Sequence, residues 1–382
     1  MKSKNLIHVF LFVILLSSFL FTGTAKAAPP ADLGKGNSPK RVCSFPALAG
    51  FARCIAWARP NATTSPTGLS PAKMIAAYGY STSATAGAGK TIALVDAYDL
   101  PTAENDLGVF STQFGLPACT TANGCFKKVN QTGGTKYPSS NAGWGLEIAL
   151  DIEWAHAIAP GAKILLVEAN SASFTNLLAA EDYAAGHAGY VSNSWGGSES
   201  LFEKTYDSHF VKSGVSFFVS AGDAGLPAEY PSASPNVISV GGTTLTFNAD
   251  GSVSETGWSY GGGGCSKYET VTSAQKPLSN ALCGTKRATP DVSLDADPNS
   301  GASVYDSTKY NGQSGWWQVG GTSLSSPMWA GRAAVSGAVV NAVYVYGSNI
   351  TFRDITSGNN GAACLVGFDL CSGRGSWLGA TP

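Results

Sequence analysis

The segment Gly320–Pro327 constrains this chain more than any other part of the sequence. It reads Gly-Gly-Thr-Ser-Leu-Ser-Ser-Pro and leads into an apolar, alanine-rich stretch that begins at Met328. A glycine-hinged turn that opens into a helix places a small hydroxyl group at the helix N-terminus, where backbone N–H groups stabilise a developing oxyanion. The pattern favours Ser323 as a catalytic nucleophile, and the alternative is an ordinary Ser/Thr helix cap.

A nucleophilic serine requires a general base, which in many hydrolases is a histidine. The four histidines are His8, His156, His187 and His209, and His8 lies in the N-terminal leader. None of them stands in a glycine-containing turn at the start of a predicted helix. A histidine-dependent serine hydrolase would need His187 or His209 beside Ser323, which makes it the less favoured enzyme class.

An acidic helix offers another base. Residues 144–158 carry apolar side chains at helical spacing, and Pro160 is expected to end the helix. Glu147 and Asp151 are four residues apart and share one face, which is otherwise apolar and expected to pack inward. Glu153 is expected on the solvated side. Paired acids on a buried face are costly unless they act in catalysis or bind a metal, and the alternative is a solvated helix with scattered acids.

A third candidate residue follows a short apolar strand. The segment Phe217–Ser220 runs into Ala-Gly-Asp-Ala-Gly, so that Asp223 stands in a turn bracketed by glycines. In a doubly wound sheet the carboxyl ends of the strands line the functional site, and Asp223 is therefore expected to point into it. An aspartate can donate a hydrogen bond to an oxyanion only when it is protonated. Taken alone, this segment would be an ordinary turn aspartate beside glycines.

Together these segments resemble one family, the sedolisins or serine-carboxyl peptidases. The resemblance rests on Glu147-x-x-x-Asp151, Ser220–Asp223 and Gly321–Ser323, and it covers about residues 68–376. Further segments that match in the family's order are Ile92–Asp96, Ser192–Gly196, Tyr230–Pro235, Val240–Thr243, Pro290–Ser293 and Arg353–Thr356. The resemblance implies a secreted bacterial endopeptidase with a subtilisin-like fold that acts on protein or peptide substrates.

The resemblance also implies a role for each residue of the site. Ser323 would attack the peptide carbonyl, and Glu147 would take its proton and later give it to the leaving amine. Asp151 would hydrogen-bond to Glu147 and hold it in place. Protonated Asp223 would stabilise the oxyanion together with the Ser323 N–H. Because Glu147 must be ionised while Asp223 is protonated, activity is expected to peak at acidic pH and fall toward neutral.

Two further sets of residues are implied by the resemblance. Asp96 and Trp195 match positions from which some family members extend the catalytic network, and both could equally be packing residues. Near the C-terminus the chain resembles the family's calcium loop, which implies one structural Ca²⁺. Hard oxygen ligands without a soft ligand suit this ion. The expected ligands are the carboxylates of Asp354 and Asp369 and the backbone carbonyls of Ile355, Leu365 and Gly367. The alternative is a pair of ordinary turn aspartates.

The order of strand-like and helix-like segments predicts an α/β fold of the subtilisin-like, doubly wound type, with a mainly parallel sheet and helices on both faces. The expected strands are residues 91–95, 163–168, 190–193 and 215–220. The expected helices besides the acidic one are residues 103–114, 174–185 and 202–211. The glycine run 261–264 is expected in a surface loop, because no Lys-Ser/Thr pair follows it as in a phosphate-binding loop.

The N-terminal residues predict export. Residues 1–27 combine early lysines, an apolar run and a final Ala-Lys-Ala, which is typical of a signal peptide. Residues 28–67 are rich in proline, alanine and glycine and are expected to form an extended arm without a full prodomain, ahead of a peptidase domain over residues 68–382. How such an enzyme stays latent is left open. No later segment is long and apolar enough for a membrane anchor, and we expect an extracellular monomer.

Composition agrees with an exported globular enzyme. The eight cysteines form four local couples, which favours disulfides; 105 pairings are possible, and we favour pairing between nearest neighbours. Charged residues make up only 13% of the chain, the net charge is −1, and there is no basic patch, which argues against nucleic-acid binding. A non-enzymatic alternative is a secreted pseudopeptidase that keeps the fold and acts as a binding protein.

Overall fold

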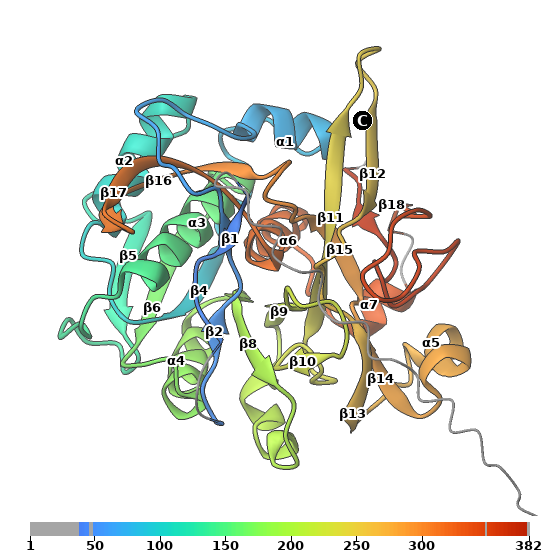
Figure 1. The fold of residues 1–382 in the computed structure, drawn as a ribbon. Helices are drawn as coiled ribbons and strands as arrows, with labels where there is room; N and C mark the ends of the chain where they lie inside the picture. Colours follow the sequence, from blue (N-terminus) through green and yellow to red (C-terminus); the bar gives the residue numbers. More distant parts are fainter. Residues whose placement is uncertain (1–37, 46–48, 348–349, 380–382) are drawn as a thin grey trace, which may run out of the picture.

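A mainly parallel sheet of eight strands forms the centre of the computed structural model, which describes residues 38–45, 49–347 and 350–379 (Figure 1). The predicted signal peptide lies outside the described residues. The strands in spatial order are β12 (Val253–Gly257), β11 (Ile238–Phe247), β9 (Ser216–Ser220), β7 (Tyr190–Asn193), β4 (Thr91–Ala97), β6 (Lys163–Ala169) and β5 (Phe126–Asn130), and β15 (Val292–Asp295) also pairs with β11. Strand β12 is antiparallel to β11, whereas the other pairs are parallel.

Helices cover both faces of this sheet, as the sequence predicts. Helices α3 (Ala142–Ile158) and α6 (Thr322–Ser336) pack against each other and against the central strands, and α4 (Phe174–His187) packs on β4 and β6. Helix α2 (Ala103–Phe114) packs on the outside of α3. The remaining helices are α1 (Pro71–Tyr78), α5 (Lys276–Cys283) and α7 (Ala342–Gly347). Among the described residues, no helix has the length and hydropathy to cross a bilayer.

Smaller sheets connect the N-terminal arm to this core. One joins β1 (Lys40–Arg41), β3 (Trp57–Ala58), β17 (Gln313–Gly320) and β16 (Ala302–Tyr310), and another joins β10 (Glu229–Tyr230), β8 (Trp195–Ser198) and β2 (Arg53–Cys54). Two further pairs are β13 (Gly264–Thr270) with β14 (Lys286–Thr289) and β18 (Phe352–Arg353) with β19 (Ser376–Trp377). The blue strands β1 and β2 run across the middle of the molecule in Figure 1.

The structure corrects three expectations. Residues 202–211 do not form one helix but two short 3₁₀ turns, Glu203–Thr205 and Asp207–Phe210. The glycine run 261–264 is buried rather than on the surface. A Cβ atom on Gly262 would lie 2.1 Å from the Ala221 carbonyl oxygen, so these glycines permit close packing of two backbone segments.

The third correction concerns Glu153, which was expected on a solvated face of the acidic helix. Every side chain of α3 from Trp144 onward is buried, because α6, α2 and β16 surround the helix on the sides that the sheet leaves open. Glu153 is fully buried, and its Oε2 accepts a hydrogen bond from the Tyr305 N–H at 3.0 Å. Residues 144–158 are apolar on nearly every side apart from the acids and His156, and a helix that is apolar all round is typically buried, so the expectation of a solvated side was wrong.

Four disulfides join nearest neighbours among the cysteines: Cys43–Cys54, Cys119–Cys125, Cys265–Cys283 and Cys364–Cys371. The preferred pairing is therefore present in the structure. Each bond closes a local loop, and the first one ties β2 to the residues that follow β1. Such crosslinks stabilise a folded chain chiefly by restricting its unfolded states.

The close crossing of α3 and α6 sets the position of the residues discussed below. A Cβ atom on Gly331 of α6 would lie 2.9 Å from the Ile158 Cβ and 3.3 Å from the Ala155 carbonyl oxygen. Gly108 of α2 is also helical, but a Cβ atom there would have no neighbour within 4 Å. An alanine at Gly108 would therefore change helix propensity alone, whereas an alanine at Gly331 would change both helix propensity and packing.

We expect Gly331→Ala to destabilise the protein and Gly108→Ala to stabilise it. Alanine favours a helix by about 1 kcal/mol over glycine, but overpacking a tight contact costs about 1–3 kcal/mol. Urea denaturation of the two variants measures the difference. Equal stabilisation by both substitutions would show that α3 and α6 do not approach as closely as described.

Candidate active site

Ser323 lies in the first turn of α6, where the chain leaves β17. Gly321 precedes this helix with a φ of +96°, in the region that favours glycine. A Cβ atom on Gly321 would lie 2.1 Å from the Ile55 carbonyl oxygen and 2.7 Å from Asp223 Oδ2. The glycine therefore allows two polar groups to approach the backbone just ahead of the serine.

Three carboxyl groups gather on the elements that pack around α6. Glu147 and Asp151 lie one turn apart on α3, and Asp96 lies near the end of β4. All three side chains are fully buried, and the oxygens of Asp96 and Glu147 accept no hydrogen bond of normal geometry from the described residues. Because an unpaired buried carboxylate is costly, this environment favours the protonated, neutral form.

The pKa values of these acids follow from burial and from their proximity. Burial raises the pKa of Asp96 to about 8. Burial also raises the pKa of Glu147 well above its ordinary range; Asp96 adds to the rise, and the Ser323 hydroxyl opposes it. The pKa of Asp151 rises for the same reasons, with burial first and the charges of Asp96 and Glu147 next. Each proton gained or lost in this group therefore changes the others.

Ser194, at the junction of β7 and β8, connects the acids to the serine. Its Oγ donates to Asp151 Oδ1 at 2.8 Å, and its carbonyl oxygen lies 3.4 Å from Ser323 Oγ, which donates to it. The expected hydrogen bond between Asp151 and Glu147 is not present among the contacts of the described residues. The two side chains instead interact through their charges, and Asp151 takes its hydrogen bond from Ser194.

Asp223 lies in the turn after β9 and faces the start of α6, as the sequence predicts. Its Oδ1 accepts hydrogen bonds from the Thr322 N–H at 2.8 Å and from Thr322 Oγ1 at 2.9 Å. Burial raises the pKa of Asp223 to about 7, although the Thr322 hydrogen bonds and Arg41 oppose the rise. Below that pH a protonated Asp223 can donate a hydrogen bond from the oxygen that Thr322 does not engage.

The described histidines form their hydrogen bonds with residues outside this cluster. His187 is exposed and its Nδ1 contacts the Tyr183 carbonyl, while His209 Nδ1 pairs with Asp182 at 2.8 Å. His156 is buried against the Pro117 carbonyl. No described histidine therefore hydrogen-bonds to Ser323, which weakens the histidine-dependent alternative.

A part of the site that sequence reasoning missed comes from the N-terminal arm. The Ile55 carbonyl oxygen accepts a hydrogen bond from the Ser323 N–H at 3.4 Å, and the Ile55 N–H donates to the Ser194 carbonyl at 3.1 Å. Arg41 Nη2 donates to the Asp223 carbonyl at 2.6 Å. Composition identified an arm over residues 28–67, but no motif in it indicates that it would reach the serine.

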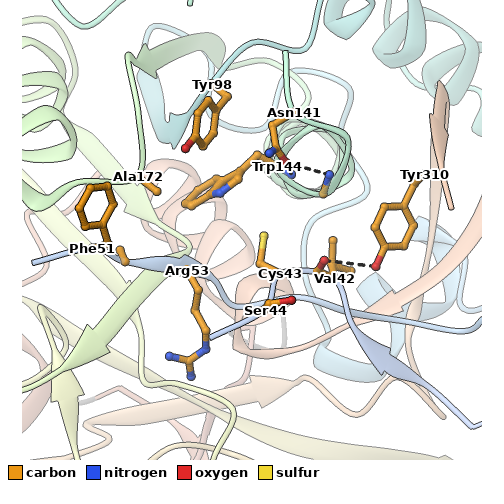
Figure 2. Close-up of a pocket in the computed structure, with 12 residues that line it drawn as sticks. Val42, Cys43, Ser44, Phe51, Arg53, Tyr98, Asn141, Trp144, Ala172 and Tyr310 are labelled. Carbon is orange, nitrogen blue, oxygen red and sulfur yellow. Dashed lines mark hydrogen bonds between the residues drawn. The ribbon is translucent and has the colours of Figure 1, made fainter. Parts of the chain in front are cut away.

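A cavity of about 420 Å³ opens beside this arm, at the N-terminus of α3 (Figure 2). The rings of Phe51, Tyr98 and Trp144 line it, and Arg53 points away from them. Tyr98 has a φ of +66°, which is uncommon outside glycine and is found most often at functional sites. The cavity lies at the N-terminal end of α3, the helix that also carries Glu147, and none of the four proposed site residues lines it.

Trp195 is a second position that the resemblance singled out. Its side chain is fully buried and packs edge to face against Phe174, with the ring centroids 6.0 Å apart. Its Nε1 has no hydrogen-bond partner among the described residues. The described contacts of Trp195 are therefore those of a packing residue, whereas Asp96 interacts with Glu147 and Asp151 through its charge.

The residues of the expected calcium loop lie together near the C-terminus. Asp354 Oδ2 accepts a hydrogen bond from the Gly367 N–H at 2.8 Å, and Asp369 Oδ2 accepts one from the Leu365 N–H at 2.6 Å. Both carboxylates thus face one loop, which the Cys364–Cys371 disulfide closes. Calcium is bound by carboxylate and main-chain carbonyl oxygens, and this loop contains both kinds of ligand. No third carboxylate joins them within the described residues.

We expect the free energy of unfolding to fall as the pH rises from about 4 to about 8. The pKa values of Asp96 and Asp223 are raised from 3.8 to about 8 and about 7, so the unfolded chain loses these protons first. Their contribution to stability is full below the unfolded pKa and is lost as the pH rises through the folded pKa. Urea denaturation at pH 4, 6 and 8 measures the slope, which Asp96→Asn should reduce. Stability that increases toward pH 8 would contradict this description.

Comparisons with known proteins agree with this geometry. The model of the subtilase family matches residues 131–353. Kumamolisin from Bacillus sp. (strain MN-32) is 30% identical over 83% of this chain and 63% of its own length. Xanthomonalisin from Xanthomonas sp. (strain T-22) is 27% identical over 80% of this chain and 45% of its own length. The chain thus spans less than two thirds of the length of either relative.

A solved structure extends the likeness to three dimensions. Pseudomonas sedolisin, a serine-carboxyl proteinase complexed with two molecules of pseudo-iodotyrostatin, superposes with a TM-score of 0.69 at 28% identity. The match covers 82% of this chain and 96% of that chain. The subtilisin-like fold that the sequence predicted is therefore confirmed. The chain belongs to the subtilase family, and its similarity to kumamolisin, xanthomonalisin and Pseudomonas sedolisin supports the resemblance to the sedolisins.

Proposed function

We propose that this chain is a serine-carboxyl endopeptidase that hydrolyses peptide bonds in proteins or peptides. The observation that carries the proposal is the cluster of buried acids around a serine at a helix N-terminus. Ser323 is close enough to Glu147 for its hydroxyl to lower the pKa of that acid, and no described histidine contacts it. The family membership supports the same chemistry.

In this proposal each residue performs one step of acyl transfer. Ser323 Oγ attacks the peptide carbonyl while Glu147 takes its proton, and Glu147 then gives the proton to the leaving amine. Water attacks the resulting ester by the same route in reverse. Asp151 interacts with Glu147 through its charge and anchors on Ser194, so it positions the base rather than reacting itself.

The oxyanion is stabilised from two sides in this mechanism. The Ser323 N–H points at a carbonyl oxygen, and a protonated Asp223 lies beside the same backbone turn. Since the pKa of Asp223 is about 7, this donor is present in acid and is lost as the pH rises through neutrality. The proposed activity is therefore expected to be highest at acidic pH.

Ser323→Ala should abolish hydrolysis, because it removes the nucleophile and costs several orders of magnitude in kcat. Ser325→Ala is the matched control, since Ser325 is a buried serine two residues further along α6 whose hydroxyl bonds only to the Thr322 carbonyl among the described residues. Both variants are incubated with an unfolded protein at pH 4 for hours, so that slow turnover is detected, and the fragments are followed by mass spectrometry.

Cleavage by wild type and Ser325→Ala but not by Ser323→Ala is the expected result. Cleavage that persists in Ser323→Ala would overturn the assignment of the nucleophile. No cleavage by any of these forms would favour the pseudopeptidase that acts as a secreted binding protein.

We also propose that the C-terminal loop holds one structural Ca²⁺. The carboxylates of Asp354 and Asp369 would supply charge, and the carbonyls of Ile355, Leu365 and Gly367 would complete the oxygen ligands. The contacts of both acids with the same loop support this assignment. Binding only to the folded chain, the ion would stabilise the protein, because ligand binding shifts the folding equilibrium.

Calcium at 100 times its Kd should add about 2.7 kcal/mol to the free energy of unfolding. Asp369→Asn and chelation with EDTA should both remove this gain. Asp250→Ala is the control, because Asp250 lies in an exposed turn away from the loop and bonds to Ser252. An unchanged melting temperature with EDTA, and no calcium in the purified protein, would exclude the site.

A further inference from the structure

A second group of carboxyl side chains lies outside the candidate active site, where β8 ends. Glu199 directly follows β8, Glu203 and Asp207 lie in the two 3₁₀ turns that come next, and Glu269 lies on β13. In Figure 1 these turns lie below β8. Glu203 is 1% exposed and Glu269 is 2% exposed. The proposed reaction uses none of these four acids, so the burial of two of them has another cause.

The two buried acids are only partly satisfied by ordinary hydrogen bonds. Glu203 Oε2 accepts a hydrogen bond from the Ser200 N–H at 2.6 Å. The Oε1 atoms of Glu203 and Glu269 are buried and accept no hydrogen bond from an N–H or O–H group of the described residues. A buried carboxylate oxygen without a donor is costly, whereas a protonated carboxyl group can itself donate. Both positions therefore favour the protonated form.

Each buried acid has a second carboxyl group as its partner. Glu203 is in hydrogen-bond contact with Glu199, and Glu269 is in hydrogen-bond contact with Asp207. Burial raises the pKa of Glu203 to about 8, and Glu199 adds to the rise. Burial also raises the pKa of Glu269 to about 7; Asp207 adds to the rise and Lys204 opposes it. Two carboxyl pairs that each share one proton result.

The partner acids are held by neighbouring strands. Glu199 accepts hydrogen bonds from the Ser266 hydroxyl and, at 3.0 Å, from the Lys267 N–H, and both residues belong to β13. Asp207 Oδ1 accepts a hydrogen bond from the Tyr230 hydroxyl of β10 at 3.2 Å. The carboxyl pairs therefore connect the 3₁₀ turns to β13 and β10, rather than lying free on the surface.

Few other charged groups face these pairs. Lys204 is exposed, so solvent screens its charge. Tyr230 stays a neutral donor, because burial and then Asp207 raise the pKa of its hydroxyl far above the ordinary value. The Lys267 ammonium lies over the Tyr268 ring, and His209 pairs with an aspartate of α4. Protons on Glu203 and Glu269 are thus the main way to relieve repulsion among the four carboxyl groups.

We propose that Glu199, Glu203, Asp207 and Glu269 form a proton-dependent latch that holds residues 199–210 against β13 in acid and releases them as the pH rises toward 8. The contribution of Glu203 and Glu269 is full below the unfolded glutamate pKa of about 4.3 and is lost as the pH rises through the folded values. The latch does not depend on the proposed reaction. It bears on the candidate site because β8 begins next to Ser194.

Hydrogen–deuterium exchange followed by mass spectrometry tests the latch at pH 5 and pH 8, with rates corrected for the intrinsic pH dependence of amide exchange. Peptides that cover residues 199–210 report local opening. Peptides from the central strand β4 report global unfolding. Between the open and the closed pKa, each acid makes opening about tenfold more favourable per pH unit. We therefore expect protection of residues 199–210, relative to β4, to be at least tenfold lower at pH 8.

The double substitution Glu203→Gln and Glu269→Gln removes the titration but keeps a hydrogen-bond donor, because an amide is neutral at both pH values and can donate to a carboxylate. Its protection of residues 199–210 should be the same at pH 5 and pH 8. Glu104→Gln is the control, since Glu104 on α2 accepts hydrogen bonds from Thr121 and faces a different part of the surface. It should keep the pH dependence of the wild type.

Equal relative protection of residues 199–210 at both pH values in the wild type would overturn the proposal. A wild-type loss of protection that persists in the folded double variant would also overturn it. Circular dichroism checks folding, and if the double variant does not fold, each single variant should show a smaller pH effect than the wild type. A full effect in both single variants would contradict the latch. The measurement uses no substrate, so its outcome is separate from that of the peptidase assay.

Discussion

Burial of several carboxyl groups around the start of α6 is the constraint on which the rest of the structure depends. A charged acid buried away from solvent is costly, so these groups keep protons at pH values where free acids lose them, even though Ser194 and Thr322 donate hydrogen bonds to two of them. Asp223 can thereby act as a donor, although its side chain is ordinarily an acceptor. The same burial links Glu147, Asp151 and Asp96 so closely that their proton equilibria are shared.

These carboxyl groups are buried because backbone segments around them pack closely against one another. Glycines at the crossing of α3 and α6, ahead of Ser323 and behind the Asp223 turn leave no side chain between segments that must touch. Residues 53–58 of the N-terminal arm complete the enclosure from the outside, because the Ile55 carbonyl oxygen accepts a hydrogen bond from the Ser323 N–H.

Much of the fold could be predicted from the sequence, because strands and helices with strong periodicity also carry clear ends. The helix 103–114 and the strand 190–193 have the predicted bounds, and the strand from Thr91 is only two residues longer than expected. The segment 202–211 failed because its turns are set by packing against neighbours rather than by its own pattern. The elements that carry Glu147, Asp223 and Ser323 were all identified correctly.

The candidate site was predicted less completely than the fold. Motifs identified Ser323, Glu147, Asp151 and Asp223 as candidates, and the structure brings them to one place. Motifs do not show which backbone groups will pack against a candidate residue, so the contact of the Ile55 carbonyl with the Ser323 N–H had no signal in the sequence. The burial of Glu153 was missed, although the apolar residues on nearly every side of 144–158 are typical of an enclosed helix.

The titration of Asp223 is the most direct test, because the proposed oxyanion donor requires this carboxyl group to be protonated. Carbon-13 NMR of protein labelled at the aspartate carboxyl carbons can follow the titration, and the signal is assigned by its loss in Asp223→Asn. We expect a midpoint near pH 7. A midpoint near the ordinary aspartate value of about 4 would contradict it.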